Sequence, residues 1–337
     1  MRIKKFFLGF IALAASISTA KAVDANTVEI VYDGASATIT IADNIKSYVT
    51  VKSGSSSHVI LIQAEDFAGI NPTASNGYGE IIYVLSGSST NGQFYMEGSF
   101  KSQVKFDGLT LTNTTGPAVH IENGKRCEVT AKSGTVNTLT DANTGDEDHK
   151  GCFHCKGHTK FKGKGTLNII GNNHHAVYSK EYVEVKNLTM NVQSSVKDGI
   201  HCKQYFLMES GSLTISGAGD DGIQVELKDE VSTGVTTDHE DEDTGNFYMT
   251  GGTLTITSPA GYAVKADGTI NFTGGTRSFD TSNILENALT SGIDGVESND
   301  PTPAVVYDLS GRQQPANIHR RGLYIIRENG KVRKIYQ

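Results

Sequence analysis

A strand pattern that returns about every two dozen residues constrains this chain more than any other feature. The segment 165–222 contains three short alternating strands, and after each comes a small residue and then an aliphatic one: Ala176-Val177, Gly199-Ile200 and Gly222-Ile223. The interval from Val177 to Ile200 is 23 residues, and the next interval, to Ile223, is 23 again. Units this short cannot bury an apolar face alone, so they must stack on one another. The pattern therefore predicts an all-β fold class, a single-stranded parallel β-helix or solenoid.

The repeat extends in both directions and includes two longer units. Val119 and Phe153 are 34 residues apart, and Ile223 and Val264 are 41 residues apart. The extra residues include two acidic segments, 141–148 and 238–243. Insertions in solenoids form loops on one face, which is often the binding face. We expect a β-helix domain over residues 101–278 that carries two acidic loops.

The first hundred residues differ from the repeat. Residues 1–22 join early basic residues to an apolar run and end in Ala20-Lys21-Ala22, which predicts a secretory signal peptide. No cysteine follows the cleavage site, so we expect export without a lipid anchor there, to an extracellular or outer-membrane surface location. Residues 23–100 are β-rich without a clear register. We interpret them as the N-terminal β cap and first coils, because a solenoid needs an atypical terminal unit to close its core.

The repeat fades toward the C-terminus. Residues 279–304 are rich in Ser, Asn, Asp and Gly, which is the composition of a linker. Residues 305–337 are predicted to form a small β module with a hairpin at Asn329-Gly330, a favoured two-residue turn.

Charge is unevenly distributed along the chain. The formal net charge is −7, but the signal segment carries +4 and the C-terminal module +5, which leaves −16 on the body between them. A body of that sign disfavours a nucleic-acid partner, so none is expected, and it favours divalent cations. We expect a monomer.

The chain has four cysteines, and its expected export would place them in a compartment that permits disulfides. Cys155 and Cys202 align in one column but two coils apart, about 10 Å, whereas a disulfide needs Cα atoms within about 7 Å. Cys152 and Cys155 are expected to face opposite sides of one strand. We interpret the cysteines as core thiols. A zinc site at Cys152, His154, Cys155 and His158 is the alternative, which a flat strand disfavours because it cannot bring these side chains together.

Alignment of the coils places side chains in columns. Two columns point inward and are small or apolar: Val119, Phe153, Val177, Ile200, Ile223 and Val264, then Ile121, Cys155, Ser179, Cys202, Val225 and Ala266. The residues between them point outward: His120, His154, Tyr178, His201, Gln224 and Lys265. The next outward column contains Glu122, Lys156, Lys180, Lys203 and Glu226.

The outward columns are candidates for carbohydrate binding. Lys156, Lys180 and Lys203 would repel one another at a spacing of about 4.8 Å unless something neutralises them. One interpretation is a track for an anionic polymer, with His154, Tyr178 and His201 as platforms for sugar rings. The alternative is a solvated face whose lysines find acidic neighbours.

Aspartates precede two of the aligned strands. Asp198 and Asp221 share a column one coil apart, and Asp220 is next to Asp221. Carboxylate oxygens suit a hard cation, so calcium is expected here. The alternative is turn chemistry, because Asp-Gly is a favoured turn pair without any metal.

The first acidic loop is a second calcium candidate. Its oxygen-bearing residues Asp141, Asn143, Asp146 and Asp148 are spaced much as in calcium loops, although the ligand set is incomplete. We interpret the second acidic segment, 238–243, as a solvated loop.

The body carries motifs in a defined order, among them Gly165-Thr-Leu-Asn-Ile169, Asp198-Gly-Ile200, Asp221-Gly-Ile223 and Gly251-Gly-Thr-Leu-Thr-Ile256. Over roughly residues 80–275 this series resembles the bacterial carbohydrate-binding β-helix family that is structurally similar to pectate lyases. The resemblance implies a right-handed coil that binds calcium and acidic or cellulosic plant polysaccharide. His175 and Tyr262 stand where that family often has Asp, so the resemblance implies fewer metal sites in this chain.

The C-terminal module has its own resemblance. Tyr307-Asp-Leu-Ser-Gly-Arg312, Gly322-Leu-Tyr-Ile-Ile326 and the final Gly330-Lys-Val-Arg-Lys334 are similar to the sorting domain of type IX secretion systems. This resemblance implies outer-membrane secretion machinery as a partner.

Three functions remain open from the sequence. A noncatalytic, calcium-assisted module that binds polysaccharide, either polygalacturonate-like or cellulose, is favoured. The first alternative is a calcium-dependent pectate lyase, in which Lys180 or Lys203 would act as the base near a metal on Asp198 and Asp221. The second is a structural surface or adhesion protein.

Overall fold

The structure is a computed structural model in which residues 23–69, 79–228, 243–288, 305–309, 311–314, 322–328 and 331–336 are described. The predicted signal peptide, the acidic segment as far as residue 242 and most of the predicted linker lie outside these residues. Across the described ranges, no helix is both long and apolar enough to cross a membrane. Two short 3-10 helices are present, η1 (Asp43–Ile45) and η2 (Glu65–Gly69).

The described chain is built almost entirely from strands in three sheets. The largest sheet contains β1 (Thr27–Asp33), β2 (Ser36–Ile41), β5 (Ile81–Ser89), β7 (Ser102–Thr112), β9 (Cys127–Ala131), β10 (Val136–Thr140), β12 (Thr159–Gly163), β13 (Thr166–Ile170), β15 (Val183–Lys186), β16 (Thr189–Ser194), β18 (Tyr205–Met208), β19 (Ser212–Ser216), β21 (Asn246–Met249), β22 (Thr253–Thr257), β24 (Ile270–Phe272) and β25 (Thr276–Ser278). The second sheet contains β3 (Val49–Val51), β4 (His58–Gln63), β6 (Gln93–Glu97), β8 (Val119–Glu122), β11 (Gly151–Cys155), β14 (His175–Ser179), β17 (Ile200–Lys203), β20 (Ile223–Glu226), β23 (Val264–Ala266) and β26 (Ile284–Leu285).

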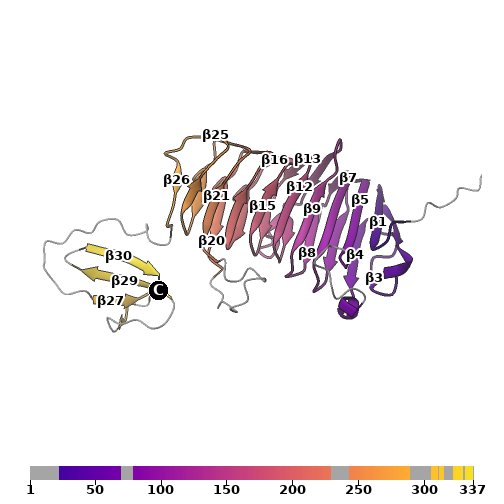
Figure 1. Cartoon of the computed structure of the whole chain (residues 1–337), viewed down its shortest axis with the longest axis horizontal. Coiled ribbons are helices and arrows are strands. Elements are labelled where there is room, and N and C mark those ends of the chain that lie inside the picture. Colours follow the sequence, from indigo (N-terminus) through magenta and orange to yellow (C-terminus); the bar gives the residue numbers. More distant parts are fainter. Residues whose placement is uncertain are drawn as a thin grey trace, which may run out of the picture.

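The strand order shows a solenoid-like arrangement of three parallel stacks. The large sheet runs β24-β21-β18-β15-β12-β9-β7-β10-β13-β16-β19-β22-β25, so it doubles back at β7. The 11-residue strand β7 pairs with β9 through its first half and with β10 through its second half. Each successive unit of chain therefore adds one strand to the β8 stack, one to the β9 stack and one to the β10 stack, as the ribbon shows (Figure 1).

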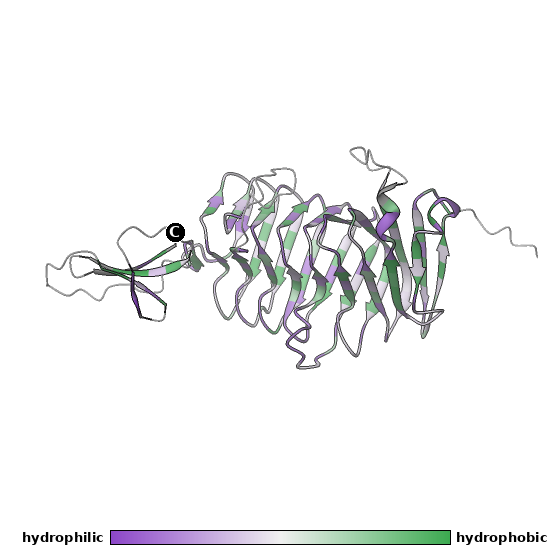
Figure 2. Cartoon of the chain, turned by 90° about the horizontal axis from the view of Figure 1, so that it is seen from below, coloured by the Kyte–Doolittle hydropathy of each residue, from purple (hydrophilic) through white to green (hydrophobic). Residues whose placement is uncertain are grey.

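The strand register confirms the predicted columns. Phe153 pairs with Val119 and Val177, and the same ladder continues to Ile200, Ile223 and Val264. All six of these side chains are fully buried. Apolar and polar residues alternate along the strands (Figure 2), as a strand with one buried face requires. The two-dozen-residue period thus translates directly into stacked strands with a continuous apolar interior.

The four cysteines are free and buried, which confirms the interpretation as core thiols. Cys152 and Cys155 are both fully buried, and the expectation that they face opposite sides of one strand stays a prediction. Cys152 lies opposite Ala176 of the next coil, because Gly151 pairs with His175 and Phe153 with Val177. Each of the two residues comes directly before the inward residue of its strand. The residues of the zinc alternative do not gather into a metal-binding group among the described residues.

The C-terminal sheet is antiparallel, with the order β28-β27-β29-β30. Its strands are β27 (Val305–Asp308), β28 (Gln313–Gln314), β29 (Leu323–Glu328) and β30 (Lys331–Tyr336). Glu328 pairs with Lys331, so β29 and β30 are neighbouring antiparallel strands. The predicted turn at Asn329-Gly330 lies outside the described residues.

Candidate cation and carbohydrate site

The outward column of the β8 stack is a continuous ladder of aromatic rings. The ring of Tyr95 meets His120 edge to face at 5.0 Å, and His120 stacks on His154 at 4.5 Å. His154 meets Tyr178 edge to face at 5.0 Å, and Tyr178 stacks on His201 at 5.4 Å. The register places these side chains one strand apart, so the predicted column of His154, Tyr178 and His201 exists. We call these five residues the ring ladder.

The ring ladder is more enclosed than a platform for sugar rings would be. Tyr178 is 9 % exposed and His201 is 7 % exposed. His175 explains part of this burial, because its ring packs against Tyr178 at 5.8 Å and His201 at 4.5 Å. The ring faces are therefore largely occupied by one another, and their edges are what a ligand can reach.

The lysine column ends in acidic residues on both sides. Lys156 pairs with Glu122 at 2.5 Å, and Lys203 pairs with Glu226 at 3.1 Å. Lys180 lies between them, is exposed, and forms no ion pair with any residue in the described part of the chain. Two of the three predicted lysines thus have acidic neighbours, and Lys180 is the cation left for an external anion.

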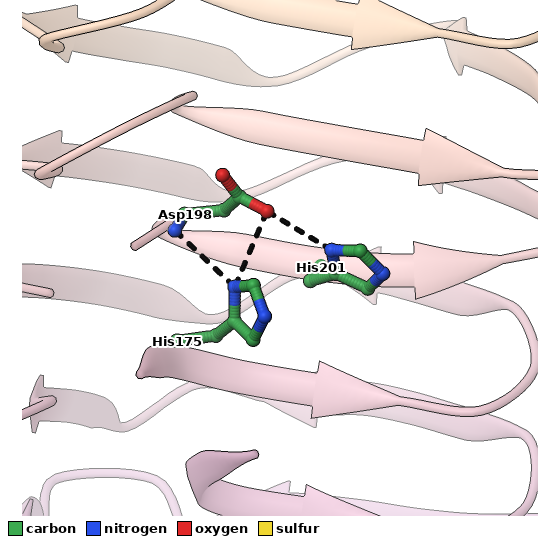
Figure 3. Close-up of side chains that lie close together, drawn as sticks. All are labelled: His175, Asp198 and His201. Carbon is green, nitrogen blue, oxygen red and sulfur yellow. Dashed lines mark hydrogen bonds and ion pairs between the residues drawn. The ribbon is translucent and has the colours of Figure 1, made fainter. Parts of the chain in front are cut away.

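Asp198 is the hub of a buried cluster at the start of β17 (Figure 3). Its Oδ2 accepts from Nδ1 of His201 at 2.9 Å and lies 3.2 Å from Nδ1 of His175. Its Oδ1 accepts from the backbone N–H of Asp221 at 3.1 Å. Burial alone would raise the pKa of Asp198, but the two histidines outweigh it and hold that pKa well below its usual range.

The second carboxylate is also tightly enclosed. Asp221 Oδ1 accepts from the backbone N–H of Tyr262 at 2.7 Å, and its Oδ2 lies 3.2 Å from Nζ of Lys265. Burial, with a contribution from Asp198, raises the pKa of Asp221 despite these contacts. The backbone of Gly261 lies directly beneath, where an added Cβ would come within 2.4 Å of Asp221 Oδ1 and 2.7 Å of the Oδ1 of Asp220.

Two groups of potential ligands emerge in the described residues. One is Asp198, Asp220 and Asp221, and the other is His175, Asp198 and His201; within each group the ligand atoms lie within 4.8 Å of one another. Asp198 belongs to both. His175 was not predicted as a ligand from the sequence. Its position in the same column as Asp198, one coil away, could have indicated that the two side chains meet.

The first acidic loop is arranged differently from the prediction. Asp141 is buried, with Oδ2 at 2.9 Å from Nε2 of the equally buried His149, and its Oδ1 accepts from the backbone N–H of Asn172. The other three predicted ligands, Asn143, Asp146 and Asp148, are exposed. Asp146 Oδ1 accepts from the backbone N–H of Asp148 at 2.9 Å, which is a turn-forming bond. Asp141, Asp146 and Asp148 do not form one of the ligand groups.

A hollow of about 520 Å³ lies on another stack, over β9, β12 and β15 and beside Glu209, which follows β18. Its charged walls neutralise each other: Lys160 pairs with Glu184 at 2.9 Å, and Lys186 pairs with Glu209. Sequence reasoning did not single out this region.

Comparison with known proteins gives the family. The family model described as "Carbohydrate-binding domain-containing protein" matches residues 72–302, which is more than half of the chain. This chain belongs to that carbohydrate-binding family. The match includes the ring ladder from Tyr95 onward and both ligand groups.

Two relatives of this carbohydrate-binding chain are informative. A carbohydrate-binding domain-containing protein of Acetivibrio thermocellus is 22% identical over 121 residues, which are 34% of this chain and 42% of that protein. The match thus spans less than half of that relative. A solved structure described as a polysaccharide lyase-like protein from C. thermocellum, gadolinium derivative, has a TM-score of 0.54 and 19% identity, and covers 77% of this chain and 99% of that one. At this identity the likeness shows the fold.

Proposed function

We propose that this carbohydrate-binding chain is an exported, noncatalytic module that binds acidic polysaccharide with the help of calcium. The observation that carries the proposal is the carboxylate group of Asp198, Asp220 and Asp221, which lies at the start of β17 and β20. Lys180, which has no ion pair within the described residues, follows the far end of the neighbouring strand β14. A strand of four residues spans about 13 Å, so a bound cation and the lysine would flank one stretch of an extended polymer.

The carboxylate group fits a hard cation. All three side chains offer oxygen, which is the ligand type calcium takes. Asp221 Oδ2 is buried, has no hydrogen-bond partner among the described residues, and lies 3.2 Å from the Lys265 ammonium. Asp220 is exposed, so the group opens to solvent on one side. Calcium there would neutralise clustered negative charge and leave coordination positions for a carboxylate of the ligand.

Lys180 and the edges of the ring ladder would supply the remaining contacts. An exposed ammonium binds a uronate carboxylate as an ion pair, and the imidazole and phenol edges offer hydrogen bonds to hydroxyl groups. Because Lys156 and Lys203 are already paired with glutamates, they would contribute less than Lys180. Polygalacturonate is therefore the favoured ligand, and uncharged cellulose would bind more weakly.

The positions of the lysines favour binding over elimination chemistry. A lysine base needs a lowered pKa. The lysine that touches the carboxylates is Lys265, and although burial lowers its pKa, Asp221 outweighs burial and raises it. Lys203 is paired with Glu226, and Lys180 lies at the far end of its strand. A sensitive test is the ultraviolet absorbance of unsaturated products from polygalacturonate with calcium; accumulation of product in proportion to enzyme would establish a lyase instead.

Export, the closed right-handed coil and the sorting role of the C-terminal module are parts of the same proposal. The sorting role rests on the sequence resemblance of residues 305–337, whose described strands form the antiparallel sheet β27–β30. The −16 charge of the body favours a monomer. Intact-mass measurement of the exported protein tests the processing: loss of residues 1–22 is expected, and retention of that segment would contradict export through a cleaved signal.

Calorimetric titration of polygalacturonate into the protein, with and without calcium, tests the binding function. We expect binding heat with calcium and little without it. An adhesion protein with no affinity for sugars would give no heat in either case.

A further inference from the structure

The group His175, Asp198 and His201 differs in chemistry from the carboxylate group beside it. Two of its three ligand atoms are imidazole nitrogens, and all three side chains are at least nine-tenths buried. Calcium prefers six to eight oxygen ligands, whereas zinc and similar transition metals bind imidazole nitrogen and carboxylate oxygen together. We propose that this group is a separate site for a zinc-class divalent metal, made of His175 Nδ1, Asp198 Oδ2 and His201 Nδ1.

The spacing of the ligand atoms fits such an ion. Asp198 Oδ2 lies 3.2 Å from His175 Nδ1 and 2.9 Å from His201 Nδ1. Ligands about 2.0–2.1 Å from a tetrahedral zinc lie about 3.3 Å from one another. Both imidazole nitrogens lie next to the Asp198 carboxylate, His175 on one strand and His201 on the next (Figure 3). An ion held by these three atoms would have its fourth position left for water or a ligand oxygen.

His175 Nδ1 faces two groups of Asp198. It accepts from the backbone N–H at 3.2 Å and lies 3.2 Å from the carboxylate Oδ2. Ligation requires the neutral imidazole, and a bound metal would take the Nδ1 lone pair in place of the backbone donor.

His201 has the outer contact typical of a metal-ligating histidine. Its second nitrogen, Nε2, lies 3.4 Å from Glu226 Oε2. Glu226 is itself fixed by Gln224 at 2.9 Å and Lys203 at 3.1 Å. A carboxylate on the far nitrogen orients the ring and raises the basicity of the coordinating nitrogen. The Tyr178 ring stacks within 25° of both imidazoles and limits their rotation.

The zinc site goes beyond the proposed calcium-assisted function but shares Asp198 with it. The two sites are separable because His175 and His201 serve only the first, and Asp220 and Asp221 only the second. The matched variants are H175Q/H201Q and D220N/D221N, and a control is H120Q/H154Q, which removes two other imidazoles of the ring ladder. Each variant is first checked for folding by circular dichroism.

The experiment is a titration of metal-free full-length protein with Zn²⁺ in competition with a chromophoric chelator. We expect one zinc per chain, at least 100-fold weaker binding in H175Q/H201Q, and unchanged binding in H120Q/H154Q and D220N/D221N. Zinc affinity that is unaffected by H175Q/H201Q, or absent from the wild type, would overturn the site.

Cobalt(II) substitution tests the geometry of the site on the wild-type chain. Strong visible absorption is expected for a four-coordinate site, and the weak bands of a hydrated octahedral ion would contradict it. If the wild type binds calcium but not zinc, the proposed function stands and the zinc site is ruled out. If it binds zinc but not calcium, the zinc site stands and the calcium-assisted function is ruled out.

Discussion

The imidazole rings of His120 and His154 stack face to face, with centroids 4.5 Å apart and planes within 7° of parallel. The first acidic loop separates them in the chain, so only the pairing of β8 with β11 brings them together. The stack excludes water from His154, whose Nδ1 is buried with no hydrogen-bond partner in the described chain. Burial, reinforced by His120, lowers the pKa of His154 to about 3.

The lowered pKa of His154 makes stability depend on pH in a defined direction. Below about pH 6.5 the unfolded chain takes up a proton that the folded chain refuses until about pH 3, so stability falls as the pH falls through this window. The effect is on the order of 2 kcal/mol at pH 4.5. We expect H154F, which keeps a ring in the stack, to lose less stability between pH 7 and pH 4.5 than the wild type in urea unfolding. The control is H58F, at a partly exposed histidine of β4 outside the ring ladder. Equal pH slopes for wild type and H154F would contradict the assignment.

The inward column should determine the stability of the coils. Phe153 is fully buried, and its ring meets Phe161 at 5.0 Å edge to face. Truncation to alanine leaves a cavity, so we expect F153A to lose about 3–5 kcal/mol of unfolding free energy. V136A is the control, because Val136 is 62% exposed and should change stability by less than about 0.5 kcal/mol. Denaturant titrations compare the two, and a loss below about 1 kcal/mol in F153A would show that the column is not packed as described.

Close stacking of neighbouring coils should be sensitive to glycine replacement. Gly163 has a φ of 120°, and an added Cβ would lie 2.1 Å from the carbonyl oxygen of Ala131 on the adjacent strand. Gly108 also has a positive φ, 76°, but an added Cβ there meets nothing within 4 Å. We expect G108A to cost about 1 kcal/mol from backbone strain alone and G163A to cost clearly more, because the strands must separate. Equal melting temperatures for the two variants would argue against the stacking at β9 and β12.

Periodicity alone was enough to predict the columns. Each coil must place the same side of its strand toward the core, so the spacing of Val177, Ile200 and Ile223 specifies which residues become neighbours. The inward and outward assignments therefore followed without knowledge of the turns. The register of residues 23–100 could not be obtained in this way, because β1–β2 and β3–β4 pair antiparallel and have no repeat.

Side-chain partners were harder to predict than columns. The sequence placed Asp141 in a calcium loop, but its burial beside His149 depends on where the long insertion folds back. His175 was treated as a missing aspartate, although its ring reaches Asp198 on the next coil. The pairing of Asp141 with His149 and that of His175 with Asp198 depend on side-chain rotamers and on the paths of the loops. The spacing of the repeat along the sequence contains no information about either.

Lys180 should contribute most of the charge-dependent affinity for an acidic polymer. We expect K180Q to weaken retention on immobilised polygalacturonate more than K156Q or K203Q, because the latter two lysines are already paired with Glu122 and Glu226. One lost ion pair on an exposed surface corresponds to about a two- to fivefold change. Affinity electrophoresis in gels with and without the polymer measures this, and raised salt should reduce the difference. If all three variants and the triple variant migrate like the wild type, the lysine column has no part in binding.

The most direct test of calcium-assisted binding is a polygalacturonate pull-down of the full chain in three conditions: with calcium, after chelation, and after chelation followed by excess calcium. The wild type should be retained, released and retained again. D220N/D221N should stay weakly bound throughout, because the carboxylates that would hold the ion are removed. Retention of the wild type that is the same in all three conditions would contradict a role for calcium in binding the polysaccharide.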